Sequence, residues 1–325
     1  MNARNHELGT RSVTAGALAT LLLLGIALAA PTEVVAKDCK ACKTVARLAL
    51  KSGLYESVEE YYLNVAKANT DADREDRREG EEEARETLIE DRDLAREQYR
   101  ARRDLCEALN ECYYDPDIDP ENFLSAAETI ADPNPYWPFI PGKLYRYEGE
   151  TEDGVEIIEV SLTGDTREIL GVECSVIRDT VWVDGEVVED TWDWFAQDTD
   201  GNVWYFGELS FEYEDGEISA LEGSWEAGED GAKPGIVMKA MPEVGCIYRQ
   251  EFLLGDAEDA AEVESLDESV TVAYGSFDGC LMTGEFTPLD PEVYEHKFYA
   301  AGVGLILEVD EESGESVELI EILDL

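Results

Sequence analysis

The sequence predicts an α+β fold: an N-terminal antiparallel helical hairpin followed by an antiparallel β meander, either barrel-like or folded as a sandwich. Two observations support this prediction: a change in the spacing of the apolar residues, and a series of turn motifs. Apolar residues recur at helical spacing up to residue 113, whereas from Leu144 onward short runs of Val, Ile, Trp, Tyr and Phe alternate with a period of two. Asp-Gly pairs at Asp184-Gly185, Asp200-Gly201 and Asp215-Gly216 separate these runs and are typical of hairpin turns.

Residues 1–36 have the composition of a secretory signal. Arg4 and Arg11 precede the apolar run "VTAGALATLLLLGIALAA". Ala27-Leu28-Ala29 is one candidate cleavage site, and Val34-Val35-Ala36, directly before Lys37, is the better one. The run is about as long as a short membrane span, so an uncleaved anchor is the alternative. We expect cleavage, and therefore an exported chain, periplasmic or extracellular, with no integral membrane span after processing.

The acidic charge is concentrated in the second part of the chain. The net charge is −51 over 325 residues, and residues 104–325 hold 8 Lys/Arg against 57 Asp/Glu. Residues 37–103 are nearly neutral, with 15 Lys/Arg against 17 Asp/Glu. Such a surface repels nucleic acid, so no nucleic-acid partner is expected. The acidity reflects either a saline habitat or the binding of cations.

Residues 37–113 are predicted to form the hairpin, with helices over 38–68 and 80–113. The polar stretch "NTDADREDRREG", ending at Gly80, is the expected turn. Apolar residues at seven-residue intervals predict the seam between the helices. In the first helix these are Leu48, Tyr55 and Tyr62, with Val45, Val58 and Val65 beside them. In the second they are Leu88, Ala95 and Leu109, interrupted by Arg102, with Ala84, Leu105 and Cys112 on the adjacent line.

Four cysteines stand at the open end of this hairpin. Folding the chain back near residue 74 places Cys42 opposite Cys106 and Cys39 opposite Cys112. We predict two nested disulfides, Cys39–Cys112 and Cys42–Cys106, since an oxidising compartment permits them. A Cys₄ zinc site and a redox-active C-x-x-C pair are the alternatives, although the spacings are not the usual zinc knuckles and no βαβ pattern surrounds the motif.

Residues 114–143 are predicted to form a Pro-rich acidic linker and plug. The linker offers weak calcium ligands, Asp115, Asp117, Asp119 and Glu121. The EF-hand register fails there because Pro120 occupies the glycine position, and a stiff linker with helix caps is the alternative. In "NPYWPFIPG", Tyr136, Trp137 and Phe139 are expected to pack onto the β body.

Residues 144–325 are predicted to form the acidic antiparallel β domain. Aromatic residues occupy both faces of the strands around residues 192–206, so one face is expected in the core while the other lines a ligand cavity or is core as well. The candidate cavity residues are Trp192, Trp194, Trp204, Tyr205 and Trp137. Cys246 and Cys280 each start a strand and are predicted to form a third disulfide, leaving Cys174 buried.

Several stretches from about residue 113 to the C-terminus resemble an uncharacterised family of exported bacterial proteins. They are "YDPDIDPENF", "NPYWPFIPGKLYRYEGE", "DWFAQDTDGNVWYFGE", "GSWEAGEDGAKPGIVMKAMPEVGCIYRQEF" and "EHKFYAAGVGLILEV". The last stretch is also similar to the final hairpin of several periplasmic β-sheet families, some of which carry lipids. The resemblance implies export and a β fold, but no reaction, and it does not extend to the helical hairpin.

Motifs for catalysis are sparse. After cleavage His296 is the sole histidine, no G-x-S-x-G elbow is present, and no Gly-rich phosphate loop occurs. We therefore expect a non-enzymatic binding or interaction module of the cell envelope, without a cofactor. Its expected partner is a small hydrophobic ligand, a divalent cation or, through the hairpin, a protein. A carboxylate-based hydrolase and a purely structural surface protein are the alternatives.

Overall fold

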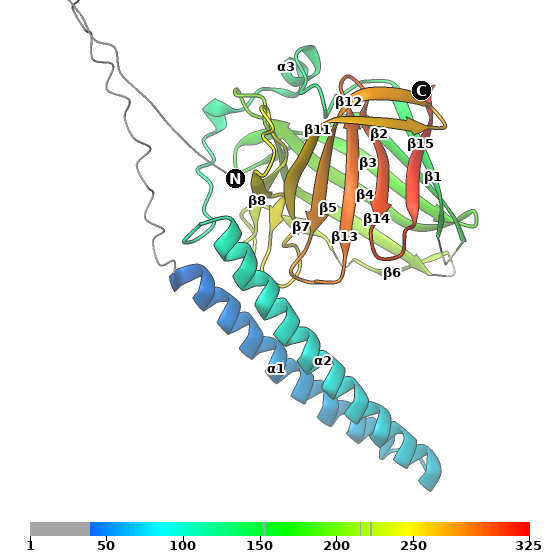
Figure 1. The fold of residues 1–325 in the computed structure, drawn as a ribbon. Coiled ribbons are helices and arrows are strands. Elements are labelled where there is room, and N and C mark those ends of the chain that lie inside the picture. The colour runs from blue at the N-terminus through cyan, green and yellow to red at the C-terminus, as the bar shows by residue number, and fades with distance from the viewer. Residues whose placement is uncertain (1–39, 152–153, 215, 222) are drawn as a thin grey trace, which may run out of the picture. The chain divides into compact units, whose positions relative to one another are not determined.

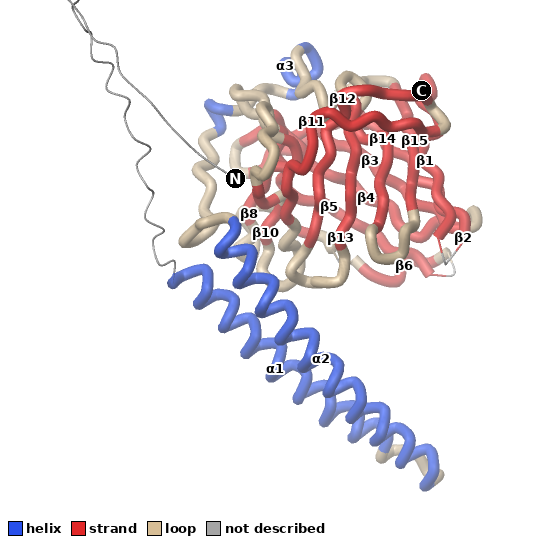
Figure 2. The backbone as a smooth tube through the Cα atoms, viewed as in Figure 1, coloured by secondary structure: helices blue, strands red, loops and turns tan. Residues whose placement is uncertain are grey.

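The computed structural model describes residues 40–151, 154–214, 216–221 and 223–325 (Figure 1). The predicted signal, residues 1–36, and Cys39 lie outside these ranges. The described residues belong to one compact unit. A pair of long helices is followed by a large antiparallel sheet (Figure 2), which confirms the predicted α+β class.

The helices are concentrated before the sheet. They are α1 (Lys40–Ala68), α2 (Arg74–Ala108), the 3₁₀ helix η1 (Pro120–Asn122) and α3 (Ala126–Ala131). The turn of the hairpin is shorter than predicted, because the Asp73 side chain accepts a hydrogen bond from the Glu75 N–H at 2.6 Å and so caps α2. Gly80, expected to end the turn, therefore lies inside α2.

Small side chains, not the predicted large ones, form most of the contact between α1 and α2. The buried residues of the two helices are Ala46, Ser57, Ala84, Ala95, Arg102, Leu105 and Cys106. A Cβ added to Gly53 would lie 3.3 Å from the Ala95 Cβ, and one added to Gly80 would lie 2.8 Å from the Ala68 Cβ. The two helix surfaces therefore touch at glycine and alanine.

The predicted seam of α1 is consequently wrong. Leu48, Tyr55 and Tyr62 are 54%, 76% and 66% exposed. Helices approach more closely where their side chains are small. The two helices therefore pack through the face with small residues and leave the face with larger apolar residues exposed. On α2 the line through Ala84 and Leu105 is buried, as predicted.

The open end of the hairpin is held by covalent and hydrogen bonds. A disulfide joins Cys42 to Cys106, with their Cα atoms 6.0 Å apart. The Cys42 N–H donates to the Cys112 carbonyl at 2.9 Å, which places Cys112 beside the start of α1. The Cys39–Cys112 bridge stays a prediction, because Cys39 is not among the described residues.

The sheet has fifteen strands. They are β1 (Lys143–Thr151), β2 (Gly154–Ile169), β3 (Val172–Val183), β4 (Glu186–Gln197), β5 (Val203–Glu214), β6 (Glu217–Ala220), β7 (Trp225–Glu226), β8 (Lys233–Met238), β9 (Ile247–Arg249), β10 (Glu251–Phe252), β11 (Ala260–Val272), β12 (Gly275–Phe286), β13 (Tyr294–Ala300), β14 (Gly304–Asp310) and β15 (Ser316–Asp324). Their order is β10-β8-β5-β4-β3-β2-β1-β15-β14-β13-β12-β11-β9, and β6 and β7 also pair with β5. Every strand pair is antiparallel, as predicted.

The sheet does not close into a barrel, yet its two ends meet in one chain segment. β9 pairs with β11 at one end of the order, and β10 pairs with β8 at the other. Only Gln250 separates β9 from β10. The sheet is therefore curled, and strands β11–β14 pass in front of β2–β5 in Figure 1.

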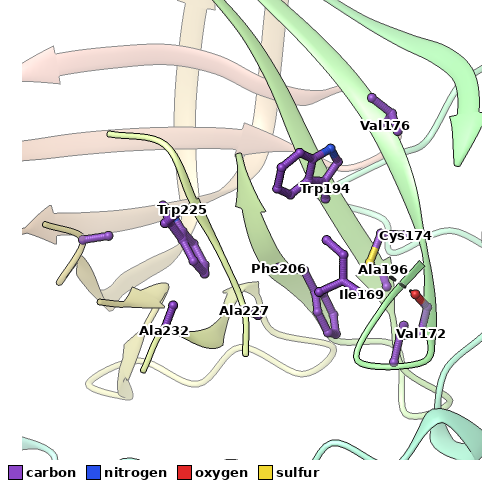
Figure 3. Packing of buried hydrophobic residues seen from close by; sticks show 11 residues of the cluster. Ile169, Val172, Cys174, Val176, Trp194, Ala196, Phe206, Trp225, Ala227 and Ala232 are labelled. Atoms are coloured by element: carbon purple, nitrogen blue, oxygen red, sulfur yellow. Dashed lines mark hydrogen bonds between the residues drawn. The ribbon is translucent and has the colours of Figure 1, made fainter. Parts of the chain in front are cut away.

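Three buried clusters form the core. One joins Phe195 and Val203 of β4 and β5 to Val263, Leu281 and Tyr299 of β11–β13, so residues from opposite ends of the sheet pack together. A second cluster gathers residues of β2–β5 with the segment around β7, including Trp194, Phe206 and Trp225 (Figure 3). A third lies under β1 and β11–β15.

The predicted Cys246–Cys280 disulfide is wrong, since both thiols are free. Cys246 directly precedes β9 and Cys280 belongs to β12, but β11 lies between these two strands. Strands on either side of a third are about 9–10 Å apart, whereas a disulfide needs Cα atoms within about 7 Å. Cys174 is buried, as expected.

Candidate functional site

A cavity of about 300 Å³ lies between the 136–140 segment and the inner face of the sheet. Strands β1–β4 provide one part of its wall and β13–β15 the other. Six aromatic side chains contribute to this wall: Tyr136, Trp137, Phe139, Tyr145, Tyr147 and Phe195. The predicted plug thus packs on the body, with the Trp137 ring centroid 5.3 Å from that of Phe195 and Phe139 only 2% exposed.

Of the five aromatic residues proposed for a cavity, Trp137 lines this one. Trp192 and Trp194 alternate with the cavity residues Asp193 and Phe195 along β4, so they point to the opposite face of the sheet. There Arg178 lies 5.2 Å from the Trp192 ring centroid, and Arg167 lies 4.0 Å from that of Trp194.

Trp204 and Tyr205 are also outside the cavity wall. The Trp204 indole N–H donates to Asp198 at 2.8 Å. The Tyr205 ring stacks on the ring of the lining residue Phe195, with 4.6 Å between the centroids, and does not itself line the cavity. The pleat of β4, which the sequence pattern did not reveal, decides which aromatic residues face inward.

Carboxyl groups occupy the polar part of the wall. Asp179 of β3 and Asp193 of β4 line the cavity together with Glu308 of β14. Burial, as the largest cause, and the nearby carboxylates of Glu189 and Glu308 together raise the pKa of Asp179 to about 8. Among the described residues, Asp179 Oδ1 is buried and has no hydrogen-bond partner.

Asp193 shares a phenol with a second carboxyl group. The Tyr205 hydroxyl lies 2.7 Å from Asp193 Oδ1 and 2.9 Å from Glu208 Oε2. A hydroxyl has one proton, so both contacts are favourable only when one of the two acids is protonated. Burial is the largest cause of this protonation and, together with neighbouring negative charges, raises the pKa values of Asp193 and Glu208 to about 8.

Lys297 is the cation of the cavity wall. Its Nζ lies 3.4 Å from Glu285, 3.4 Å from Glu295 and 3.3 Å from Glu308. Burial favours the neutral amine, but the three glutamates outweigh it and raise the pKa of Lys297 well above its ordinary value. One lysine thus serves three acids and leaves none of its charge for Asp179.

His296 lies on the alternate face of β13 from Lys297. Its Nε2 contacts Glu264 at 2.9 Å and its Nδ1 contacts Glu311 at 2.7 Å. Both ring nitrogens are thus engaged by carboxylates, which gives the ring a role in linking β11, β13 and the turn after β14.

The weak calcium ligands are not brought together. Asp115 pairs with Lys233, and Asp119 caps η1 by accepting a hydrogen bond from the Glu121 N–H at 3.1 Å. Asp117 is an exposed side chain of the linker. Among the described residues, no group of three or more His, Cys, Asp or Glu side chains is placed to hold a metal ion.

Sequence reasoning missed Asp179, Asp193 and Lys297. A signal exists, since Asp179 follows Ile177 and Asp193 precedes Phe195 at the two-residue period of inward-facing positions. Because carboxylates are so abundant in this chain, an acidic residue at an inward-facing strand position is easily mistaken for one of the many surface charges.

The comparisons with known proteins add two solved structures. No protein-family model matches the chain, and no curated protein matches it. A crystal structure from Bacteroides fragilis NCTC 9343, described as a "putative exported protein with YmcC-like fold", is 15% identical, covers 58% of this chain and 99% of its own, and has a TM-score of 0.36. A "putative lipoprotein" from Parabacteroides distasonis ATCC 8503 is 13% identical, covers 59% of this chain and 100% of its own, and has a TM-score of 0.29. Neither likeness bears on what this chain does.

No helix within the described residues has the length and apolar character needed to cross a membrane.

Proposed function

We propose that the chain is an exported, non-enzymatic binding module of the cell envelope, and that its cavity holds a small, largely hydrophobic ligand. The cavity itself carries the proposal: about 300 Å³ of space behind six aromatic side chains. Engineered cavities of about 150 Å³ take up benzene, and natural ligand sites begin at about 300 Å³. A ligand of one to three aromatic rings fits this range.

Two features support export to the cell envelope or beyond. The signal-like composition of residues 1–36 favours it, and the Cys42–Cys106 disulfide is typical of an oxidising compartment. The division into a signal (1–36), a hairpin (37–113), a linker (114–143) and a β domain (144–325) belongs to the same proposal.

Filling the cavity tests the binding function. Fluorescence of the neutral probe N-phenyl-1-naphthylamine is titrated against the processed chain, and we expect saturable 1:1 binding. Val160→Trp places a large ring in the cavity wall and should abolish it, whereas Val155→Trp, at an exposed position of the same strand, should not. Circular dichroism checks that both variants fold. Equal binding by the two folded variants, or no binding by the parent chain, contradicts the proposal.

A carboxylate-based hydrolase is the second candidate. Asp179 and Asp193 favour it, because acids held protonated near neutral pH suit general-acid catalysis. Turnover of aryl glycosides that is lost in Asp193→Asn but kept in the surface variant Asp267→Asn would support this candidate. If no aryl glycoside is turned over, the hydrolase candidate is rejected and the binding function remains.

A further inference from the structure

The cavity wall carries more negative than positive groups. Asp179, Asp193 and Glu308 face the cavity, and Lys297 is the cation among its lining residues. That lysine is already surrounded by glutamates at 3.3–3.4 Å. The charge of Asp179 is therefore not balanced from within the wall.

A purely apolar ligand does not solve this imbalance. Asp179 Oδ1 is buried and, among the described residues, lacks a hydrogen-bond partner. A hydrocarbon in the cavity offers neither a hydrogen-bond donor nor a positive charge to the carboxyl groups of Asp179 and Asp193 in the wall. A ligand with a positive nitrogen compensates the negative charge that these two carboxyl groups bring to the wall when they ionise.

The aromatic part of the wall suits the same ligand. Trp137 and Phe195 are packed against each other, and Tyr147 lies in the wall on β1. The faces of such rings attract cations, most strongly where water is excluded. A site that combines aromatic faces with a buried carboxylate selects an organic cation over an inorganic one, because an inorganic ion gains nothing from the apolar surface and keeps its hydration.

We propose that the cavity binds a small organic monocation, an aromatic or aliphatic body that carries one ammonium group, with the positive nitrogen against Asp179 and Asp193. The proposal rests on the proposed binding function and names its ligand class. A body of one or two rings matches the volume of about 300 Å³.

Binding of the cation is coupled to proton release. Four glutamates act on Asp179: Glu156 of β2, Glu189 of β4, Glu208 of β5 and Glu308 of β14. Asp179, Glu189 and the Tyr205 hydroxyl act on Asp193, and Lys297 of β13 lines the same cavity. A bound ammonium favours the ionised form of a nearby carboxyl group, so a proton held by the free protein is released. Affinity for a permanent cation therefore rises with pH between about 6 and 9.

The experiment compares a cation with its neutral isostere. Benzyltrimethylammonium and neopentylbenzene, which have the same shape, displace N-phenyl-1-naphthylamine from the processed chain at pH 8. We expect the cation to bind at least about tenfold more tightly, which is a difference of about 1.4 kcal/mol. Asp179→Asn, and independently Asp193→Asn, should reduce the affinity for the cation about tenfold and leave that for neopentylbenzene unchanged. The exposed Asp267→Asn should change neither.

The outcomes separate this inference from the proposed function. If both compounds bind equally, or if neither Asn variant weakens cation binding, the organic-cation inference fails while the binding function stands. If the fluorescent probe and both compounds fail to bind, the binding function fails as well. Calorimetry in two buffers of different ionisation enthalpy provides an independent readout, and no proton release at pH 7 contradicts the coupling.

Discussion

Asp179 is a residue whose native environment opposes its own ionisation. Its neighbours are other acids, its Oδ1 has no partner among the described residues, and burial raises its pKa to about 8. A carboxyl group with a raised native pKa stabilises the fold fully only below its unfolded pKa of about 4. This contribution is lost as the pH rises through about 8.

Asp179→Asn should therefore stabilise the protein at high pH alone. We expect the melting temperature of the variant to exceed that of the parent by about 3 °C at pH 8.5 and to match it at pH 5, because asparagine does not ionise. Differential scanning calorimetry at the two pH values measures this, with the exposed Asp267→Asn as the control. A lower melting temperature for Asp179→Asn at pH 8.5 would show that the carboxylate has an undetected partner.

At this scale the sequence predicted one covalent pair correctly, Cys42–Cys106, and one of the five proposed cavity residues, Trp137. Cys42 and Cys106 lie at equal distances from the predicted turn, so their positions in the sequence are enough to pair them. Trp192 and Trp194 were assigned to a cavity although the pleat turns them away, and Asp193 between them was overlooked. Side-chain direction in a strand depends on which face is enclosed, and in a curled sheet only the tertiary structure decides that.

The helical hairpin is held by small residues on its inner face. Ala95 of α2 lies against Gly53 of α1, and no space remains for a larger group. We predict that Ala95→Leu lowers the free energy of unfolding of the hairpin by about 1–3 kcal/mol through overpacking. Tyr55→Ser, at a 76% exposed position, should change it by less than about 0.5 kcal/mol. Urea titration monitored by circular dichroism at 222 nm measures the free energy of unfolding of both variants. Equal losses would mean that the helices pack through the larger residues after all.

The hairpin also contacts the sheet region through a buried ion pair. Arg102 Nη2 donates to Glu258 Oε1 at 2.6 Å, and the two side chains are only 7% and 2% exposed. Glu258 also accepts a hydrogen bond from the Gly255 N–H at 2.9 Å. The arginine that interrupts the apolar line of α2 is therefore directed at the strand region and not at α1.

Arg102→Met should leave Glu258 buried without its cation. We predict a loss of about 3–5 kcal/mol in the free energy of unfolding, which is typical when one partner of a buried pair is removed. Arg96→Met, which breaks an exposed pair with Asp93, should cost less than about 1 kcal/mol. The double variant Arg102→Met/Glu258→Met should recover most of the loss, and failure to recover would assign the effect to packing instead of charge.

Elements were predictable where their signal is local. The hairpin turn at Asp184-Gly185 has the positive φ values, 50° and 86°, that Asp-Gly favours in such turns. The Cys246–Cys280 bridge failed because β11 lies between the two cysteines in the chain and between their strands in the sheet. The predicted meander already implies this strand order, so the pairing could have been rejected from the sequence.

At the scale of the whole molecule, buried acids set the response to pH. Among the described residues, burial as the largest cause raises the pKa values of eight carboxyl groups: Asp91, Glu156, Asp179, Asp193, Glu208, Glu251, Asp259 and Glu295. Exposed groups such as Glu128 and Asp310 have lowered pKa values because hydrogen bonds favour their ionised forms, but exposure limits their effect. The native chain therefore binds more protons than the unfolded chain between about pH 4 and 8.

The melting temperature should consequently fall as the pH rises from 5 to 8.5, in contrast to the acid lability of most proteins. Repulsion among surface charges acts in the same direction, so the measurement belongs in 1 M NaCl, where the Debye length is about 3 Å. A melting temperature that rises with pH under these conditions would mean that the buried acids are ionised and paired. A saturating organic cation should flatten the dependence if the cavity binds it.

The segment that joins β9 to β10 has a further consequence. A sheet edge normally offers unpaired amides that recruit a strand from another molecule. Here the six residues from Ile247 to Phe252 bond to β11 with one half and to β8 with the other. Further along β11 its register with β12 shifts, and this part of the strand carries Glu264, Asp267 and Glu268. Along this margin of the described sheet, crowded copies of the chain therefore meet no long regular strand on which to add, which limits fibrillar self-association there.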